Sequence, residues 1–385
     1  MITKISNGKI ITENEILKDK NLYIQDGIIK EITSRDISCD NVIDAEGMYI
    51  SPGFIDMHLH GGAGHDFADG NPDAVSEIAC YHCKHGSTTI FPTTLSASYE
   101  NIVKSLSAIK YAINSGNIVS NISGVHLEGP YFSKKQSGAQ NPCFITAPVK
   151  KDYKRILEDY GDVIRRWSFA PELEGSMEFV QELFKSGVIG SFAHSDATYD
   201  EIIELYKKGV RLITHFYSCI STITRKKGVR ILGMTEFGYL HDDVFVEAIA
   251  DGCHIPVDLF KLLYKIKGRD KICLVTDAMR CSGVDDEISE IGGVPCKIKN
   301  GVAYLMDESA FAGSIATTDR LVRFCVKQAG IDLCSAIKMI TANPAEVMCL
   351  KNKGRIKTGF DADLVIFDEN INVKKVMVNG SEIKI

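Results

Sequence analysis

Residues 174–215 read EGSMEFVQELFKSGVIGSFAHSDATYDEIIELYKKGVRLITH, and this stretch decides the fold class. Two amphipathic segments, 174–185 and 199–208, are each followed by a glycine, and short apolar runs over 189–193 and 212–214 come after them. Apolar residues at helical spacing with a closing glycine predict helices, while short apolar runs between helices predict buried strands. The pattern therefore indicates alternating strands and helices.

The same alternation extends through the middle of the chain, where 257–267 is another predicted helix. The eight predicted strands are 53–56, 87–91, 122–125, 167–170, 189–193, 212–214, 245–250 and 272–276. Eight strand–helix repeats in about 250 residues favour an α/β fold of the (β/α)8 TIM-like barrel type. A doubly wound open sheet is the alternative, but no G-x-G-x-x-G turn follows the first strand, so a dinucleotide site is not expected.

Both ends of the chain contain short strands broken by turn pairs such as Asn-Gly and Asp-Gly. The predicted terminal strands are 4–6, 9–12, 21–24, 28–32, 355–357, 362–367 and 375–378. Neither end alone has enough strands for a stable core. We therefore expect residues 1–50 plus 352–385 to form a small β-sandwich domain, and residues 51–351 to form a metal-dependent barrel.

The composition excludes several classes of partner. The 385 residues carry 44 Lys and Arg against 50 Asp and Glu, a net charge of −6, which gives no general attraction to nucleic acid or anionic lipid. No apolar run approaches the roughly 20 residues that span a bilayer, and the amino terminus lacks a signal-peptide pattern. The 12 cysteines are scattered, as reduced thiols are. We expect a cytoplasmic protein with no nucleic-acid or membrane partner.

One tight group of possible metal ligands is Cys80, His82, Cys83 and His85. It resembles half of a zinc knuckle, but no second Cys/His pair follows at suitable spacing. A helix that begins at Pro72 and closes at the glycine after the group explains the same residues without a metal ion. We favour the helix.

Polar side chains close six of the eight predicted strands. They include His58 and His60, His126 and Glu128, His194, His215, Asp251 and His254, and Asp277. Residues two apart on a strand share a face, so His58 and His60 both point to the barrel mouth. If these polar groups were buried without partners, each would raise the free energy of the folded state by several kcal/mol. A divalent cation bound among them would compensate this cost for all of them together. Histidine with carboxylate suits zinc, and iron, manganese or cobalt are alternatives.

These motifs resemble the amidohydrolase superfamily and, within it, the deacetylases of amino-sugar phosphates. In chain order the matching motifs are PGFIDMHLHGG at 52–62, HGSTT at 85–89, HLEGP at 126–130, AHSDA at 193–197, DGCH at 251–254, TDA at 276–278 and AGS at 312–314. The resemblance implies hydrolysis of the acetamide of N-acetylglucosamine-6-phosphate to glucosamine-6-phosphate and acetate. Another N-acetyl sugar phosphate, such as N-acetylgalactosamine-6-phosphate, is an alternative substrate. A non-catalytic barrel that binds a sugar phosphate is the alternative from a different class.

The resemblance also implies two groups of metal ligands. The main ion would be bound by Glu128, His194 and His215. A second ion would lie between His58, His60 and Asp277, with Glu128 as the bridge, so one or two ions are expected. Asp277 would act as general base and then general acid during attack of metal-activated water on the acetamide.

Five further residues are expected to bind the substrate. Gln140 and His254 would contact the sugar or its acetamide. Ser218 and Cys219 stand where the family has an asparagine and an alanine whose backbone helps to bind phosphate. Arg225 matches the arginine that, in the family, reaches the phosphate in the neighbouring subunit's site, which implies a homodimer. The alternative for Arg225 is a solvated basic loop.

Overall fold

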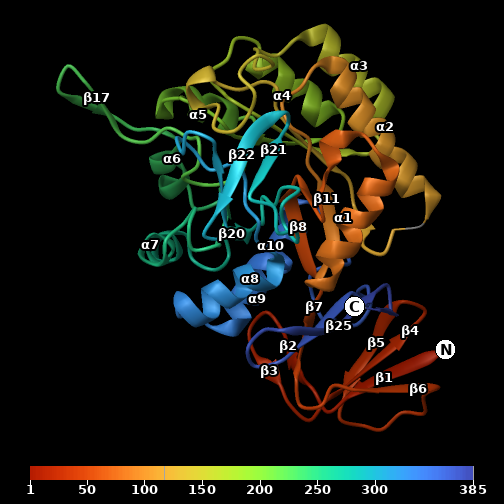
Figure 1. The fold of residues 1–385 in the computed structure, drawn as a ribbon. Helices are drawn as coiled ribbons and strands as arrows, with labels where there is room; N and C mark the ends of the chain where they lie inside the picture. Colours follow the sequence, from red (N-terminus) through yellow and green to blue (C-terminus); the bar gives the residue numbers. More distant parts are fainter. Residues whose placement is uncertain (117, 385) are drawn as a thin grey trace.

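The computed structural model describes residues 1–116 and 118–384, so residues 117 and 385 of the predicted barrel and terminal domain lie outside it. A body of alternating strands and helices forms the larger part, and a group of strands that contains both chain ends lies beside it (Figure 1). Within the described residues, no helix is both long and apolar enough to cross a bilayer.

All eight predicted strands of the body are confirmed, and their neighbour pairs are parallel. They are β8 (Phe54–Leu59), β11 (Ser87–Pro92), β12 (Asn121–Ile122) with β13 (Val125–Glu128), β14 (Ile164–Phe169), β15 (Ile189–Phe192), β16 (Leu212–Ile213), β19 (Phe245–Ala248) and β20 (Ile272–Leu274). They form two sheets, β12-β11-β8 and β13-β14-β15-β16-β19-β20. Thr93 bridges to His126 at one junction, and the Asp277 N–H donates to the His58 carbonyl over 2.9 Å at the other. Spatial order therefore follows chain order, and the strand ends meet at one rim.

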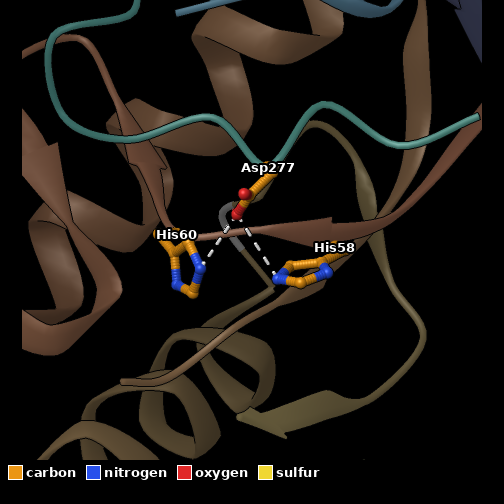
Figure 2. A group of neighbouring side chains, drawn as sticks. All are labelled: His58, His60 and Asp277. Atoms are coloured by element: carbon orange, nitrogen blue, oxygen red, sulfur yellow. Dashed lines mark ion pairs between the residues drawn. The ribbon is translucent and has the colours of Figure 1, made fainter. Parts of the chain in front are cut away.

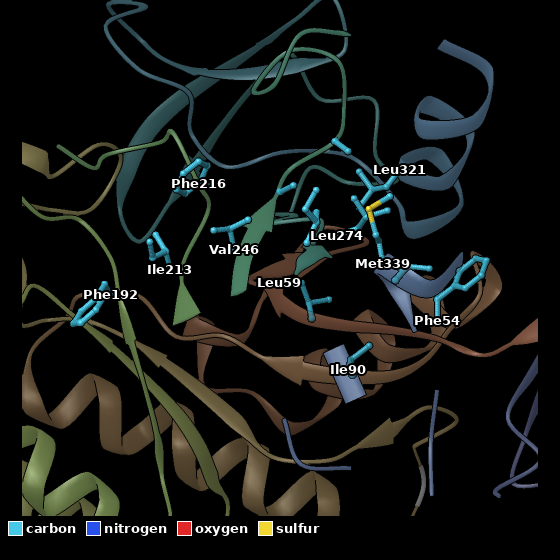
Figure 3. Close-up of a cluster of buried hydrophobic side chains, with 14 of the residues drawn as sticks. Phe54, Leu59, Ile90, Phe192, Ile213, Phe216, Val246, Leu274, Leu321 and Met339 are labelled. Carbon is cyan, nitrogen blue, oxygen red and sulfur yellow. The ribbon is translucent and has the colours of Figure 1, made fainter. Parts of the chain in front are cut away.

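Helices lie between these strands and cover them. They are α1 (Pro72–Lys84), α2 (Tyr99–Ser115), α3 (Lys150–Tyr160), α4 (Ser176–Lys185), α5 (Tyr199–Tyr206), α6 (Met234–Leu240), α7 (Val257–Lys267), α8 (Thr318–Arg323), α9 (Leu333–Ile340) and α10 (Ala342–Val347), with short helical turns at Phe67–Asp69, Lys134–Gln136 and Phe324–Gln328. The three helices predicted by periodicity are confirmed as α4, α5 and α7. Gly268 ends α7 at a φ of +68°, a conformation that favours glycine. The apolar helix faces pack on strand residues such as Ile90, Ile213 and Val246 in one large core (Figure 3).

The Cys80 to His85 group lies on α1 and its end, as the helical interpretation predicts. The His82 Nε2 lies 2.9 Å from the Gly61 carbonyl, and the His85 Nδ1 lies 3.2 Å from Asp319. The imidazoles thus have different partners. In the described residues, the groups able to hold a metal ion are elsewhere.

Burial makes His82 a source of acid sensitivity. Its pKa is lowered from 6.5 to about 4 because the ring is fully buried and water cannot solvate its protonated, charged form. Protons therefore bind the unfolded chain first, and stability is lost as the pH falls from 6.5 towards 4. We expect His82→Gln to lose less stability than the wild type between pH 7 and pH 5, by about 2 kcal/mol. Urea unfolding at the two pH values measures this, and equal losses would contradict it.

The terminal strands form two further sheets. Residues near the amino terminus form the sheet β5-β4-β1-β6, from β1 (Ile2–Ser6), β4 (Asn21–Gln25), β5 (Ile28–Thr33) and β6 (Asn41–Asp44). Both ends of the chain form the sheet β26-β25-β24-β7-β2-β3, from β2 (Lys9–Ile11), β3 (Ile16–Leu17), β7 (Tyr49–Pro52), β24 (Leu364–Phe367), β25 (Val373–Val378) and β26 (Ser381–Ile383). Ile5, Ile50 and Leu364 share one core, so both ends contribute to it. The predicted strand at 355–357 is wrong, because this segment is a loop between turns at Gly354 and Gly359.

Three strand groups were not anticipated. A hairpin of β17 (Thr224–Lys226) and β18 (Val229–Ile231) projects from the body, as Figure 1 shows. A three-stranded sheet of β21 (Ile288–Ile291), β22 (Val294–Lys299) and β23 (Val302–Leu305) follows β20. A short pair, β9 (Gly61–Gly62) and β10 (His65–Asp66), follows β8.

Candidate metal centre

The six predicted metal ligands converge at the carboxyl ends of the body strands. They are His58 and His60 from β8 and the residue after it, Glu128 from β13, His194 after β15, His215 after β16, and Asp277 after β20. All six are buried. They form two groups of three, His58 with His60 and Asp277, and Glu128 with His194 and His215, and in each group the possible ligand atoms lie within 4.8 Å of one another.

Glu128 is the centre of this arrangement. Its Oε1 lies 3.1 Å from the Nε2 of His215, 3.4 Å from that of His58 and 3.5 Å from that of His194. Its Oε2 lies 3.3 Å from the Nε2 of His60. One carboxylate therefore contacts an imidazole of both groups, as a bridging ligand does.

Asp277 completes the group on β8. Its Oδ1 lies 3.1 Å from the Nε2 of His60 and 3.4 Å from the Nε2 of His58 (Figure 2). Both rings turn the same nitrogen towards the carboxylate, because residues two apart on a strand point the same way.

The hydrogen bonds of the imidazoles test whether the centre suits a cation. The Nδ1 of His194 lies 2.8 Å from the Gln136 carbonyl, and the Nδ1 of His215 lies 3.1 Å from the Ser218 carbonyl. Carbonyl oxygens only accept, so each Nδ1 holds a proton and each Nε2 presents a lone pair. The two Nε2 atoms are 3.1 Å apart, and the buried Nε2 of His58 has no hydrogen-bond partner. Facing lone pairs repel, so these residues fit a metal ion between them.

The pKa shifts agree with a site built for positive charge. Burial lowers the pKa of His60, but its contacts with Asp277 and Glu128 outweigh burial and raise the pKa to about 10. Burial likewise raises the pKa of Glu128, and the surrounding imidazoles, His58 first, hold it well below its usual value. The carboxylates thus stay ionised and favour a cation among the imidazoles.

Backbone strain concentrates at three of the ligands. His194, His215 and Asp277 have φ angles of +44°, +26° and +49°, in a region that non-glycine residues rarely adopt. Such conformations cost about 1–3 kcal/mol each and persist where the surroundings enforce them. The strand ends therefore turn sharply at the ligands.

A cavity of about 290 Å³ opens above the ligands. Predicted site residues that line it are His60, Glu128, Gln140, His194, His215, Ser218, Cys219, His254 and Asp277. Leu95, Ile291 and Phe311 add an apolar part to its wall. The cavity therefore offers both polar and apolar surfaces, as small-molecule sites do.

Three predicted substrate contacts have fixed partners. The Gln140 side chain donates to Glu128 Oε2 over 2.6 Å and accepts from the Ser96 N–H over 2.7 Å. The Nδ1 of His254 lies 2.8 Å from Asp251 Oδ2. The Ser218 N–H donates to the His215 carbonyl over 2.9 Å, so this amide is engaged within its own turn.

The structure does not bring Arg225 to this cavity. Arg225 lies on the exposed hairpin, and the residues lining the cavity include none from it. Lys226, Lys227 and Arg230 share the hairpin, and in the described chain none of these four side chains has an ion pair with an acidic group.

Sequence reasoning missed Arg166 on β14 and Glu247 on β19. Both are fully buried and form an ion pair beneath the ligands, and Glu247 also contacts His58. The available signal was a charged residue within each apolar strand, since such residues are seldom buried unless paired.

A parallel α/β body whose strand ends gather four imidazoles and two carboxylates is typical of metal-dependent hydrolases of the TIM-barrel type. The chain belongs to the amidohydrolase family, which matches residues 49–383.

The chain is similar to deacetylases of N-acetyl sugar phosphates. An N-acetylglucosamine-6-phosphate deacetylase of Lysinibacillus sphaericus is 30% identical over 378 residues, with 98% of this chain and 96% of the relative covered. An N-acetylgalactosamine-6-phosphate deacetylase of Escherichia coli O157:H7 is 27% identical, with 97% of each chain covered. A solved mutant of the N-acetyl-D-glucosamine-6-phosphate deacetylase of Mycobacterium smegmatis, in complex with N-acetyl-D-glucosamine-6-phosphate, has a TM-score of 0.90, 27% identity and coverage of 99% of this chain and 98% of its own.

Proposed function

We propose that the chain hydrolyses the acetamide of N-acetylglucosamine-6-phosphate to glucosamine-6-phosphate and acetate. The observation that carries this proposal is that five of the six residues of the two ligand groups, Asp277 among them, line one cavity. A relative named as a deacetylase, 30% identical and aligned over 98% of this chain, supports the same reaction. The enzyme is thus a hydrolase of a linear amide bond.

The proposed metal sites are the two ligand groups. Glu128, His194 and His215 would hold the main divalent ion, and His58, His60 and Asp277 would hold a second, while Glu128 contacts imidazoles of both groups. Zinc suits these nitrogen and oxygen donors, while iron, manganese and cobalt are the alternatives that metal analysis distinguishes. A bound divalent cation supplies Lewis-acid chemistry, because it lowers the pKa of water and polarises a carbonyl group.

Asp277 is the proposed proton carrier. It takes a proton from the water that attacks the acetamide carbon and delivers it to the sugar nitrogen as the C–N bond breaks. This delivery is needed because an amide anion is a very poor leaving group. The buried carboxylate is suited to the task because its pKa, which burial would raise, is lowered by His58 and His60, so it is ionised at neutral pH.

Gln140 and His254 orient the substrate in this proposal. The Gln140 amide is held by Glu128 and Ser96, so it supports the carboxylate and borders the reacting group. His254 is held through Nδ1 by Asp251, which leaves Nε2 for a hydrogen bond to the sugar or its acetamide. Both residues line the cavity.

N-acetylgalactosamine-6-phosphate is the second candidate substrate, since one relative deacetylates the sugar phosphate of that name. A non-catalytic barrel that binds a sugar phosphate is the remaining alternative. Binding alone, however, needs neither two groups of possible metal ligands nor an aspartate beside them that can carry a proton. Acetate release from the two phosphorylated sugars and their unphosphorylated forms, with protein of measured metal content, separates the three. We expect release to be fastest from N-acetylglucosamine-6-phosphate, and metal-independent binding without release would refute an enzyme.

The phosphate is proposed to be bound by the Ser218 and Cys219 turn together with Arg225 of a second copy in a homodimer. The hairpin of Arg225 projects from the body with four basic side chains that lack acidic partners in the described chain. Arginine suits this role because it can hold phosphate through two parallel hydrogen bonds. A hairpin that extends from its own body is suited to contact a neighbour.

Mixing two inactive variants tests this role of Arg225. Asp277→Asn lacks the proton carrier, and Arg225→Ala lacks the phosphate contact. A mixed dimer has one site with both defects and one site with neither, so we expect activity to recover to about half that of the wild type per mixed dimer. Acetate release after co-refolding measures this. No recovery, with mixed dimers seen by native mass spectrometry, would refute the cross-subunit contact.

We also propose how the body strands close into a barrel and how the two chain ends form a domain. The eight strands form a closed (β/α)8 barrel within residues 51–351, and residues 1–50 plus 352–385 form a small β-sandwich domain. The hydrogen bonds at both junctions of the two parallel sheets support closure, and the core shared by both chain ends supports the terminal domain. We propose a cytoplasmic enzyme whose partner is a small sugar phosphate.

A further inference from the structure

The ion pair beneath the ligands is fully enclosed. Arg166 and Glu247 have no exposed surface, and the Nη1 of Arg166 pairs with the Oε1 of Glu247. The other guanidinium nitrogens donate to the hydroxyls of Ser191 and Thr214, over 2.8 Å and 2.6 Å. Both charges therefore have partners, as buried charges require.

The second oxygen of Glu247 contacts both ligand groups. Its Oε2 lies 3.0 Å from the Nδ1 of His58 and accepts the backbone N–H of His215 over 3.0 Å. His58 belongs to one group of metal ligands and His215 to the other. A single buried carboxylate oxygen thus touches a residue from each proposed metal position.

These contacts fix the position of the His58 proton and the backbone conformation of His215, and both matter for metal binding. An ionised carboxylate only accepts, so Glu247 holds the proton of His58 on Nδ1 and leaves the lone pair of Nε2 facing Glu128 and Asp277. The bond to the His215 N–H also restrains that residue in its strained backbone conformation, with a φ of +26°. Arg166 places its positive charge against the Oε1 of Glu247, and the Oε2 is left to accept from His58 and His215.

We propose that Arg166 and Glu247 are a positioning pair that prepares both ligand groups for divalent cations. The proposal rests on the proposed function only in that the centre binds metal. Neither residue lines the cavity or belongs to a ligand group, and Glu247 acts through His58 and His215. Loss of such outer partners typically weakens metal binding about 10–100-fold.

If the ion pair had only a structural role, its replacement would change at most the stability and not the metal binding. Replacing a buried pair by apolar side chains of similar size often leaves stability unchanged, whereas removing one partner strands a buried charge. The double variant Arg166→Met/Glu247→Leu is therefore expected to unfold near the wild-type temperature, while Glu247→Leu alone unfolds at a clearly lower one. Under a structural role, the double variant would also bind metal normally.

The test is zinc titration of chelator-stripped protein without substrate. We expect the double variant to bind zinc about 10–100-fold more weakly than the wild type, with weakening at both positions. Nitrogen NMR of the stripped double variant is expected to show the His58 proton on Nε2, towards Glu128 and Asp277, whereas the wild type keeps a proton on Nδ1. The matched control is Asp66→Leu/Arg280→Met, which removes a mostly buried Asp–Arg pair that bonds no predicted ligand, and it should bind zinc normally.

Wild-type zinc affinity and an unchanged His58 proton in the double variant would overturn the proposal. If the double variant is insoluble, Glu247→Gln keeps the side-chain shape and removes the charge, and unchanged zinc affinity in that variant would overturn it equally. Failure of the proposed function looks different. A wild-type protein that binds zinc but releases no acetate would refute the deacetylase and leave the positioning pair intact.

Discussion

Asp277→Asn is expected to lower kcat for acetate release by about 10²–10⁴-fold, with KM nearly unchanged. The amide cannot accept a proton from the attacking water and cannot return one to the sugar nitrogen. Glu128, His194 and His215 do not involve Asp277, so the variant is expected to keep at least one metal ion per chain. Steady-state acetate release, measured beside metal content and the melting temperature, checks all three expectations.

A second buried aspartate provides the control. Asp319 also pairs with an imidazole, at 3.2 Å from His85, but it does not line the cavity. Asp319→Asn is expected to lose some stability and to keep its kcat. Near-normal turnover in Asp277→Asn would eliminate this residue as the proton carrier. A loss of turnover that follows the loss of metal would instead assign Asp277 to metal binding alone.

The fold of the body was predictable because its signals are local. β15 and α5 follow each other as an apolar run, a turn and an amphipathic stretch, each readable within about ten residues. The β17–β18 hairpin lacked such a signal. Its side chains are mostly exposed and basic, so no apolar alternation marks its strands, and pairing depends on the turn around Gly228.

The convergence of the six predicted ligand residues was predictable for a different reason. The body strands are parallel and in chain order, so their carboxyl ends lie at the same edge, and polar residues far apart in sequence meet without knowledge of side-chain contacts. Glu247 could not be found in this way, because it lies inside an apolar run and its meaning depends on Arg166 and His58, which come from other strands. The sequence also could not show that Arg225 lies outside the cavity lining, because a motif match does not indicate how far a hairpin projects from the body.

Glu128→Gln is expected to remove nearly all bound metal and, with it, nearly all activity. Among the described residues, Glu128 is the one carboxylate that contacts imidazoles of both groups. An amide in its place presents a donor N–H to nitrogens that must donate lone pairs to the metal. The loss in metal affinity should exceed the about 10–100-fold that is typical of outer partners. Metal analysis after gel filtration and acetate release with added zinc measure it.

Glu172→Gln is the matched control for this variant. Glu172 is another largely buried strand-end carboxylate, held by the Ser195 hydroxyl at 2.8 Å and the Asp196 N–H at 2.7 Å, and it belongs to neither ligand group. It should therefore keep wild-type metal content. If Glu128→Gln also kept two ions, the groups would fill independently and Glu128 could not bridge them. If it kept one, the His58, His60 and Asp277 group would have to bind metal without help, because His194 and His215 alone supply only two ligands.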